Sequence, residues 1–476
     1  MEIKKYAVGK TIAEVFGIAL PCGGKGKCGR CRVQVRGELS APDETERAIL
    51  RDAADGIRLA CRAVCMGKVV LTSEMNTVVA ITDKYDCYGA DAPISNGKFG
   101  AALDIGTTTL AAKLIETATG RVITTATAPN PQSRYGADVT TRMEYAVNGG
   151  AEELRELVVD AVNSLLRELT NEPIHTAVIV GNTAMLCLLT GADVTGMTVA
   201  PFIPESKFGI FTDARKILGK CSVERLYFAP CVSAFVGADT VAASLACNIG
   251  GLGSTLLCDI GTNGELVFAK DGKITCTSTA AGPALEGAEI SCGMTAGRGA
   301  VDRVRITDGH LSVSAIEDAP AIGICGSGLI SAAAALLDLG VLEPSGYLEA
   351  PFKITEGVTL LPTDIRKLQA AKAAVRAGIE ILTRENIPDR VVMAGGFGHY
   401  LDIGDCIRIG LLPEWVRGRT VSVGNAALTG ACMMLQNGAL IEEAERFTKT
   451  AELCELDLCG EFPDKYVESI IFSNKE

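Results

Sequence analysis

One short motif occurs twice in this chain, and it constrains the fold more than any other feature of the sequence. The first copy, Leu103–Thr109, reads Leu-Asp-Ile-Gly-Thr-Thr-Thr, and the second, Cys258–Gly264, reads Cys-Asp-Ile-Gly-Thr-Asn-Gly. Each copy ends one apolar stretch and is followed by another, at Leu110–Ile115 and at Glu265–Ala269. Two similar strand–turn–strand units indicate an internal duplication. The repeat therefore predicts two similar α/β lobes that face each other.

The sequence around the two copies fits such lobes. Apolar residues recur at helical spacing from Leu154 to Leu169 and again from Ile365 to Leu382, which predicts two amphipathic helices. Two short apolar runs, at 177–180 and 391–393, predict buried strands that end at glycines. We expect the duplicated region to cover residues 99–476, with lobes that begin near residues 99 and 254.

The repeated turns have the composition of phosphate-binding turns. Glycine lets the backbone approach a phosphate closely, successive N–H groups form an anion cradle, and threonine hydroxyls add donors. An aspartate at the end of a strand can hold hydrated Mg²⁺ or orient an attacking water. The candidates are Asp104, Gly106, Thr107 and Thr108 in the first copy, and Asp259, Gly261, Thr262, Asn263 and Gly264 in the second. Either aspartate could position the water.

A third glycine-rich segment follows the second predicted helix. In Val391–Gly398 a buried strand leads into Gly395 and Gly396, and Phe397 comes next. A double glycine allows the backbone to pass close to a flat ring such as adenine. Taken alone, the segment is better interpreted as an ordinary turn. After two phosphate-type turns it favours nucleotide binding, with Gly395, Gly396 and Phe397 beside the adenosine.

The N-terminal part of the chain carries a different signal, a set of four cysteines. Cys22, Cys28 and Cys31 lie in one glycine-rich loop, and Cys61 comes from a separate segment. Plant-type [2Fe–2S] ferredoxins place three thiolates close together and one far away, with a first gap one residue shorter than here. Structural zinc sites usually show two close pairs of ligands, and here the second pair is missing. A Cys28–Cys31 dithiol is a further alternative. We favour the iron–sulfur cluster.

The residues around these cysteines predict a small domain over residues 1–73. A short helix at 11–20, a strand at 32–35, a charged helix at 45–55 and a closing strand at 69–71 give the order of a β-grasp ferredoxin-like domain of the α+β class. Only a short segment precedes the first helix, so we expect the N-terminal hairpin of such a domain to be reduced. Residues 74–98 have the turn-rich composition of a linker.

Composition and charge narrow the function classes. The chain has 476 residues and a net charge of −12, which argues against nucleic acid as a partner. Its 18 cysteines, without a recognisable export signal, predict a reduced, cytoplasmic protein. No uninterrupted apolar stretch is long enough to predict a membrane span. Lys25, Lys27, Arg30 and Arg32 surround the cysteine loop, where they would compensate the charge of a cluster and suit docking to an acidic redox partner.

Together these motifs resemble two known groups of proteins. The repeated turns and the glycine-rich strand are similar to the sugar kinase, heat-shock protein 70 and actin superfamily, an ATPase fold whose two duplicated lobes enclose one nucleotide. A ferredoxin-like N-terminus fused to that fold resembles the ATP-dependent reductive activators of corrinoid enzymes. Further stretches that carry this resemblance are Asn130–Gln132, Gly136–Val139, Gly181–Met185, Ala280–Gly287, Ile290–Met294 and Gly326–Gly328. Cys187 departs from the family, in which a histidine is more usual at that place.

The resemblance implies a function and its partners. It implies ATP-dependent reduction of inactive Co(II) to Co(I) in a corrinoid protein or corrinoid methyltransferase, with one electron passed through a [2Fe–2S] cluster from a low-potential donor such as a ferredoxin or flavodoxin. The cofactors that it implies are the cluster, ATP and Mg²⁺. A homodimer is compatible with the sequence, which does not determine the oligomeric state.

Three other functions stay open at this level. The chain could be a small-molecule kinase with an accessory iron–sulfur domain, or a redox-regulated ATPase that binds a partner without passing it electrons. It could also be the ATP-coupled activator of another low-potential enzyme, such as a dehydratase. Dehydratase activators usually hold a [4Fe–4S] cluster between two subunits, and the ATPase region of this chain has no matching cysteine pair.

Overall fold

A computed structural model of the chain describes residues 2–16, 32–50, 56–72, 88–136, 138–251, 253–287, 289–307, 309–384 and 386–473. The chain forms two compact units that divide near residue 84. The smaller unit is N-terminal, and the larger unit contains both copies of the repeated motif. Three of the four predicted cluster ligands, Cys22, Cys28 and Cys31, lie outside the described residues.

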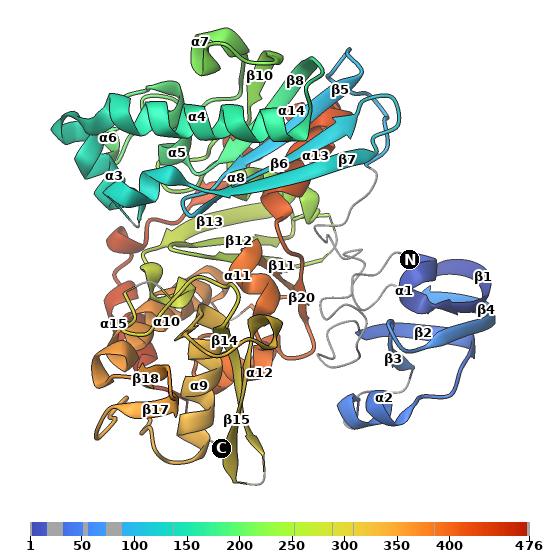
Figure 1. Ribbon diagram of the computed structural model, residues 1–476, viewed down its shortest axis with the longest axis vertical. Helices are drawn as coiled ribbons and strands as arrows, with labels where there is room; N and C mark the ends of the chain where they lie inside the picture. The colour runs from blue at the N-terminus through green and yellow to red at the C-terminus, as the bar shows by residue number, and fades with distance from the viewer. Residues whose placement is uncertain are drawn as a thin grey trace. The chain divides into compact units, whose positions relative to one another are not determined.

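The smaller unit is a four-stranded antiparallel sheet with two short helices. Its elements are β1 (Glu2–Thr11), α1 (Ile12–Phe16), β2 (Arg32–Leu39), α2 (Glu44–Ile49), β3 (Ile57–Leu59) and β4 (Val64–Thr72), and its strands lie in the order β1-β4-β2-β3 (Figure 1). The strands expected at 32–35 and 69–71 form parts of β2 and β4. Among the described residues a single strand, β1, precedes α1, which agrees with the expected reduction of the N-terminal hairpin. Ile12, Val35, Leu59 and Val69 belong to the buried core.

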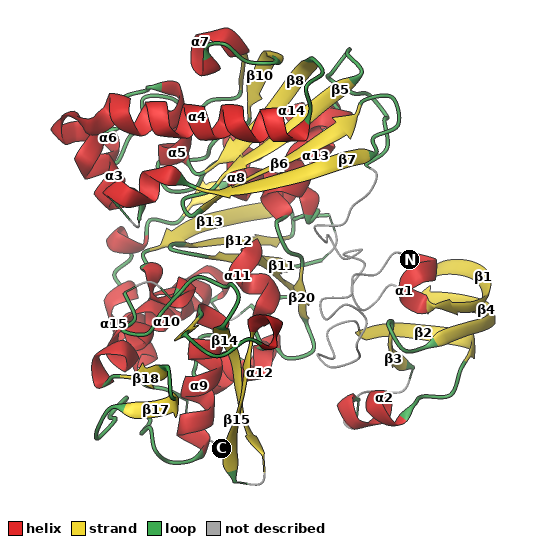
Figure 2. Ribbon diagram, viewed as in Figure 1, coloured by secondary structure: helices red, strands yellow, loops and turns green. Residues whose placement is uncertain are grey.

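The larger unit begins with a lobe built on a six-stranded mixed sheet in the order β7-β6-β5-β8-β10-β9. Its strands are β5 (Phe99–Ile105), β6 (Thr109–Glu116), β7 (Val122–Pro129), β8 (Ile174–Gly181), β9 (Ile210–Asp213) and β10 (Val223–Phe228). Its helices are α3 (Val139–Tyr145), α4 (Ala151–Leu169), α5 (Thr183–Thr190), α6 (Thr195–Thr198), α7 (Ala214–Leu218) and α8 (Ala238–Ala246). In Figure 2, α4 covers the face of the sheet that is turned to the viewer.

The second lobe contains another six-stranded sheet, in the order β20-β19-β11-β12-β13-β21. Its strands are β11 (Thr255–Ile260), β12 (Gly264–Lys270), β13 (Lys273–Thr279), β19 (Arg390–Ala394), β20 (Thr420–Ser422) and β21 (Glu452–Leu453), with smaller sheets formed by β14 (Ala300–Thr307), β15 (His310–Ala315) and β16 (Gly323–Ile324), and by β17 (Phe352–Thr355) and β18 (Val358–Leu360). The helices that follow α8 are α9 (Gly326–Asp338), α10 (Pro362–Thr383), α11 (Gly395–Tyr400), α12 (Ile403–Arg408), α13 (Ala426–Gln436), α14 (Ala439–Thr450) and α15 (Phe462–Ile470).

The two large sheets share one topology, which supports the predicted duplication. In the first lobe, β5 pairs antiparallel with β6 and parallel with β8. In the second lobe, β11 pairs antiparallel with β12 and parallel with β19. The order β7-β6-β5-β8 is thus repeated as β13-β12-β11-β19. Each repeated turn joins the central strand of its lobe to that strand's antiparallel neighbour.

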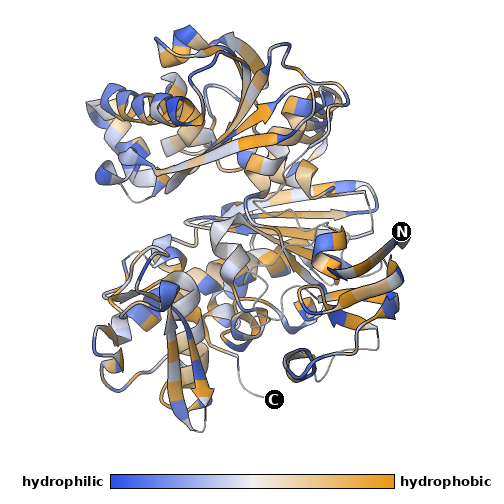
Figure 3. Ribbon diagram, turned by 45° about the vertical axis from the view of Figure 1, so that its right-hand side comes forward, coloured by the Kyte–Doolittle hydropathy of each residue, from blue (hydrophilic) through white to orange (hydrophobic). Residues whose placement is uncertain are grey.

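The buried elements agree with the hydrophobic patterns of the sequence. The two predicted amphipathic helices are α4 and α10, and the two predicted buried strands lie within β8 and β19. Six of the seven residues of β5 are buried, since helices cover the sheet. Figure 3 shows the hydrophobic colour concentrated on the central strands of the large sheets, with the hydrophilic colour on the outer helix faces.

Part of the segment expected to be a linker is hydrogen-bonded to the first lobe. The backbone N–H of Tyr88 donates to the Gly120 carbonyl at 2.8 Å, and that of Ile94 donates to the Leu435 carbonyl at 2.9 Å. Residues 88–98 are therefore bound to the surface of the larger unit and do not form a free linker. The turn-rich composition of this stretch fits an irregular path along a lobe as well as it fits a linker. Residues 74–87 lie outside the described residues.

Helix α13, near the C-terminal end of the chain, packs against α8 and against β5 and β8 of the first lobe, and one glycine makes this approach close. A Cβ added at Gly430 would lie 2.1 Å from the carbonyl oxygen of Ala242 on α8. We expect Gly430→Ala to destabilise the larger unit by about 2 kcal/mol, because an overpacked contact with backbone forces a helix to move. Urea unfolding measures this loss. Gly460→Ala is the matched control, since a Cβ there has no neighbour within 4 Å. Equal stability of the two variants would contradict the packing argument.

Candidate functional site

The two repeated turns lie at the carboxyl ends of the central strands of the two lobes. Asp104 is near the end of β5, in register with Val180 of the parallel strand β8. Asp259 is near the end of β11, in register with Ala394 of the parallel strand β19. Open α/β sheets bind their ligands at the carboxyl ends of such strands. The duplicated topology therefore gives each lobe an equivalent binding edge.

The first turn is closed by hydrogen bonds from the backbone and from two asparagines. The Gly106 N–H donates to the Thr109 carbonyl at 3.1 Å, and a Cβ added at Gly106 would lie 2.5 Å from that oxygen. The buried Asn130 side chain donates to the Gly106 carbonyl at 2.8 Å. The Thr107 hydroxyl accepts from the Asn182 amide at 2.9 Å. The turn therefore requires glycine at its first position, and the side-chain hydrogen bond from Asn130 stabilises it.

The second turn is also closed by a backbone hydrogen bond from its first glycine, although this bond spans one residue fewer than in the first turn. The Gly261 N–H donates to the Asn263 carbonyl at 2.8 Å. Gly264 begins β12, and a Cβ added there would lie 2.6 Å from the hydroxyl oxygen of Thr279. Both predicted turns are thus tight turns that follow the aspartate of a central strand after one further strand residue.

The third glycine segment contacts the second turn directly. Gly395 has a φ of +80°, and its N–H donates to the Gly424 carbonyl at 2.9 Å. A Cβ added at Gly395 would lie 2.4 Å from Oδ1 of Asp259, whereas a Cβ added at Gly396 would meet nothing within 4 Å. The backbone at Gly395 therefore lies against the carboxylate, and the space beside Gly396 is open. Phe397 is part of α11, and its side chain lies outside the described ones.

One carboxylate links the two turns. The hydroxyl of Thr262 donates to Oε2 of Glu286 at 2.7 Å, and the hydroxyl of Thr108 donates to the same oxygen at 3.3 Å. Thr262 is in the second lobe and Thr108 is in the first. The structure thus brings the two predicted phosphate turns together around Glu286.

Several half-buried carboxyl groups share this region. Burial raises the pKa of Asp104 to about 7, against a lowering by its hydrogen bond from Asn425, and the charges of Asp239 and Asp259 raise it further. Burial, with the charges of Asp239 and Glu286, raises the pKa of Asp259 to about 7. Burial also raises the pKa of Asp239 to about 6. A site that disfavours carboxylate charge in this way favours a divalent cation.

The carboxylates alone do not form a closed metal cage. Within the described ranges, no three acidic, cysteine or histidine side chains converge closely enough to hold a metal ion. Mg²⁺ usually takes one or two carboxylates, and substrate phosphates and waters supply its other ligands. Asp104 and Asp259 therefore fit Mg²⁺ that arrives with a nucleotide.

Several residues of this region received no role from the sequence, although Asn182 lies in the Gly181–Met185 stretch that carries the family resemblance. Asn425 caps α13 by accepting from the Leu428 N–H, and its amide donates to Oδ2 of Asp104 at 2.7 Å. Asn182 caps α5, and Asp239 lies at the start of α8. Each of these side chains comes just before or just inside a helix, which is a detectable pattern. The sequence does not show that all of these helices begin beside the same turns.

Cys61 is the predicted cluster ligand that the structure describes. It lies between β3 and β4 and is 9% exposed. The residues just before Cys61 are bound by the buried Glu46 carboxylate of α2. This carboxylate accepts from Nε of Arg58 at 2.8 Å and from the Leu59 N–H at 2.7 Å. Glu46 therefore fixes the end of β3, from which the Cys61 segment starts.

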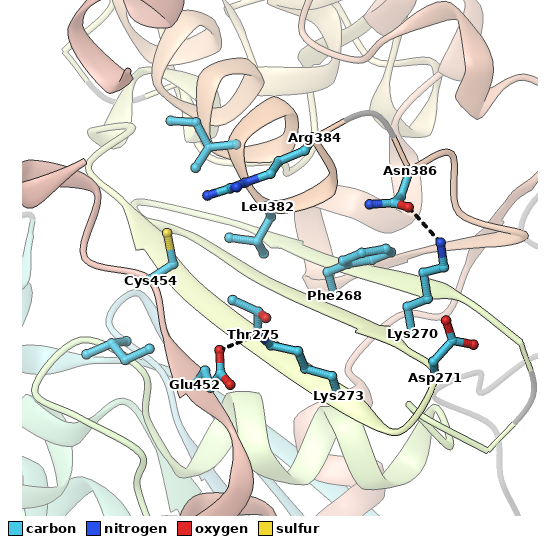
Figure 4. A pocket seen from close by; sticks show the side chains of 12 residues that line it. Phe268, Lys270, Asp271, Lys273, Thr275, Leu382, Arg384, Asn386, Glu452 and Cys454 are labelled. Carbon is cyan, nitrogen blue, oxygen red and sulfur yellow. Dashed lines mark hydrogen bonds and ion pairs between the residues drawn. The ribbon is translucent and has the colours of Figure 1, made fainter. Parts of the chain in front are cut away.

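A separate pocket of about 580 Å³ lies at the edge of the second lobe and contains none of the predicted site residues (Figure 4). Two of its basic side chains have partners within it, since Lys270 donates to Asn386 at 2.6 Å and Lys273 pairs with Glu452 at 2.8 Å. We therefore place the candidate site at the repeated turns.

Across the described part of the chain, no helix is both long and apolar enough to cross a bilayer.

Comparison with protein families covers most of the chain. The model of the RACo middle region matches residues 99–251, and the model of the C-terminal domain of RACo, the ASKHA domain, matches residues 253–476. The chain belongs to the RACo family. Its duplicated lobes are accordingly an ASKHA fold, which is the actin and sugar kinase architecture that the sequence predicts.

Individual relatives of this RACo-family chain extend over most of its length. The corrinoid activation enzyme RamQ of Eubacterium limosum is 29% identical over an alignment of 430 residues, which covers 79% of this chain and 70% of the relative. The reductase of a Co(II) methylated amine-specific corrinoid protein from Methanosarcina barkeri is 24% identical over an alignment of 400 residues, which covers 74% of this chain and 72% of the relative. A solved reductive activator for a corrinoid, iron–sulfur protein has a TM-score of 0.72 at 25% identity and covers 98% of this chain and 96% of its own.

The raised pKa of Asp104 predicts a pH-dependent stability of the nucleotide-free protein. A carboxyl group whose pKa is about 7 when folded and 3.8 when unfolded stabilises the fold most at low pH, and this contribution is lost as the pH rises towards 7. The Asp104→Asn side chain does not ionise, so this pH-dependent loss of stability disappears in the variant. The amide also keeps an oxygen that can accept from Asn425. We expect the Tm of the variant, relative to wild type, to increase between about pH 4.5 and about pH 7.5. A Tm difference that stays constant over this range would contradict the assignment.

The Glu46 contacts predict how firmly the Cys61 segment is held. Glu46→Ala would leave Arg58 half-buried and unpaired, which costs about 3 kcal/mol when one partner of a buried pair is removed. We expect faster hydrogen exchange in peptides covering residues 56–72, measured by mass spectrometry on the full chain. Glu44→Ala, at an exposed position in the same helix, should change exchange there little. Similar exchange in both variants would refute a positioning role for Glu46 in this RACo-family protein.

Proposed function

We propose that this chain is an ATP-dependent reductive activator of corrinoid proteins, which returns inactive Co(II) to Co(I) by delivering one electron. Its relatives include proteins named for corrinoid activation and for reduction of a Co(II) corrinoid protein. The observation that carries the proposal is the pair of aspartate–glycine turns at equivalent strand ends of two duplicated lobes. Such a pair is suited to a nucleotide between lobes whose arrangement can change.

The nucleotide residues have distinct roles in this proposal. The hydroxyls of Thr107, Thr108 and Thr262 and the backbone of the turns, from Gly106 and from Gly261, Asn263 and Gly264, would bind the phosphates. Asp104 and Asp259 would hold hydrated Mg²⁺, and one of them would position the attacking water. Gly395, Gly396 and Phe397 would border the adenosine. The open space beside Gly396 and the tight contact of Gly395 with Asp259 both support this placement.

A [2Fe–2S] cluster would be held by the thiolates of Cys22, Cys28, Cys31 and Cys61. Such a cluster supplies one-electron transfer at a potential of about −400 mV. Cys61 and the Glu46 contacts behind it would fix one side of that site. The electron comes from a low-potential carrier such as a ferredoxin or flavodoxin, and the product is Co(I) on the partner protein. The donor is oxidised by one electron for each cobalt that is reduced.

ATP supplies the free energy that this unfavourable electron transfer needs. Each 100 mV of unfavourable potential costs about 2.3 kcal/mol per electron, so a cluster alone would reduce only a small fraction of a lower-potential cobalt centre. The lobes can supply the difference if their nucleotide-bound arrangement prefers the partner state that is easier to reduce. The lobes would take up the nucleotide-bound arrangement because the phosphates and Mg²⁺ bind residues of both lobes. These residues are Asp104, Asp259 and the threonine hydroxyls of the turns.

The deciding experiment is anaerobic and spectroscopic. Purified protein is mixed with a corrinoid protein in the Co(II) state, a reductant and Mg·ATP, and the visible spectrum is followed for Co(I). Co(I) that forms only with ATP would support the proposal. An iron–sulfur spectrum and ATPase activity without Co(I), over several corrinoid partners, would refute it and favour a dehydratase activator or a regulatory ATPase. Phosphorylation of a small molecule would instead indicate a kinase.

Asp259→Asn tests the nucleotide half of the proposal in the same assay. We expect ATP-dependent Co(I) formation to fall about 100-fold or more, because the variant loses the negative charge that holds Mg²⁺ or orients the water. The visible spectrum of the cluster should not change, since the ligand cysteines belong to the other unit. Asp271→Asn makes the same change at an exposed turn and should keep full activity. Loss of the cluster spectrum in Asp259→Asn would contradict the separation of the two sites.

A further inference from the structure

The Glu286 carboxylate lies where the phosphates of the proposed function would bind. Its Oε2 accepts from the hydroxyls of Thr108 and Thr262, which are predicted phosphate donors. Its Oε1 lies over the second turn, since a Cβ added at Gly261 would be 3.3 Å from it. A carboxylate on an anion cradle takes the place of a phosphate oxygen. Two groups of the same charge cannot share these donors without a cation between them.

The backbone holds Glu286 in the second lobe. It is the last residue of a short 3₁₀ helix, Pro283–Glu286, whose Ala284 and Leu285 side chains are buried. The next residue, Gly287, has a φ of +84°, and a Cβ added there would lie 2.7 Å from the Met294 carbonyl oxygen. Since this anchoring is local to the second lobe, the hydrogen bond from Thr108 is a contact between the lobes.

We propose that Glu286 is an internal occupant of the phosphate site, and that the phosphates of ATP displace its carboxylate and thereby release the Thr108 contact between the lobes. This inference rests on the proposed function for the identity of the ligand, whereas the bridge itself rests on the two hydroxyl contacts of Glu286. Glu286 acts in it as a positioning residue. When the phosphates take over the two hydroxyls, the interlobe bond is exchanged for bonds to the nucleotide. Occupancy of the site is thereby coupled to the lobe arrangement.

Hydrogen exchange on the nucleotide-free full chain tests the bridge. We expect Glu286→Ala to exchange faster than wild type in peptides covering both turns, residues 103–110 and 258–265. Glu286→Gln should retain protection, because its amide oxygen can accept both hydroxyl bonds. Glu144→Ala removes an exposed helical glutamate of the first lobe and should not alter these peptides. Unchanged exchange at both turns in Glu286→Ala would overturn the inference.

Binding of Mg·ATP tests the displacement. Calorimetry should show about tenfold tighter binding to Glu286→Ala than to wild type, since a hydrogen bond to a charged group no longer competes. Glu286→Gln should be intermediate, because a neutral acceptor competes less. Weaker binding to Glu286→Ala would overturn the inference and make Glu286 a ligand of the nucleotide-bound Mg²⁺.

A third measurement separates this inference from the proposed function. Saturating Mg·ATP should increase exchange in the wild-type peptide around residues 283–287 while both turns stay protected. If ATP binds and this peptide stays protected, displacement is refuted while the proposed nucleotide site stands. If wild type binds no Mg·ATP at millimolar concentration, both the nucleotide part of the proposed function and the displacement fail. The exchange difference between Glu286→Ala and Glu286→Gln would still show whether the bridge exists.

Discussion

The larger unit depends on placing two aspartates at the ends of strands whose other residues are almost all buried. Asp104 and Asp259 leave the sheets where the chain turns, and burial raises the pKa of each to about 7. A structure can keep such groups only if they have hydrogen-bond partners or an external cation. Asn425 supplies a partner to Asp104, and Gly395 lets the backbone approach Asp259. The helices and glycines around the turns follow from this requirement.

The same requirement explains how the two lobes are connected. Helix α13, from the C-terminal part of the chain, returns to the first lobe and brings its cap Asn425 to Asp104. Glu286 makes the second connection, between Thr108 and Thr262. Both connections end at residues of the repeated turns. A ligand that changes the turns therefore changes contacts between the lobes, which is the property that an ATP-driven activator needs.

Much of the fold could be predicted because its elements are local and strongly patterned. The amphipathic spacing in α4 and α10 and the apolar runs in β8 and β19 reflect burial of one helix face or of both strand faces. The repeat gave the duplication, since similar turns need similar strands on each side. The expected linker was harder, because turn-rich composition fits a free segment and an irregular segment along a surface. Residues 88–98 are the second kind, and their backbone bonds to Gly120, Leu435 and Gln436 reveal it.

The sequence alone contains the local motifs on which the proposals rest: two aspartate–glycine turns, a glycine-rich strand end and four cysteines whose spacing predicts a ferredoxin-type cluster. Which distant residues complete the turns depends on how the chain packs in three dimensions. Asn182, Asp239, Glu286 and Asn425 come from four separate segments. Asn182 and Glu286 lie in stretches that carry the family resemblance, but no local pattern places any of the four beside the turns. Their convergence depends on sheet order and helix packing, which are set by long-range contacts. A local pattern carries no information about such contacts.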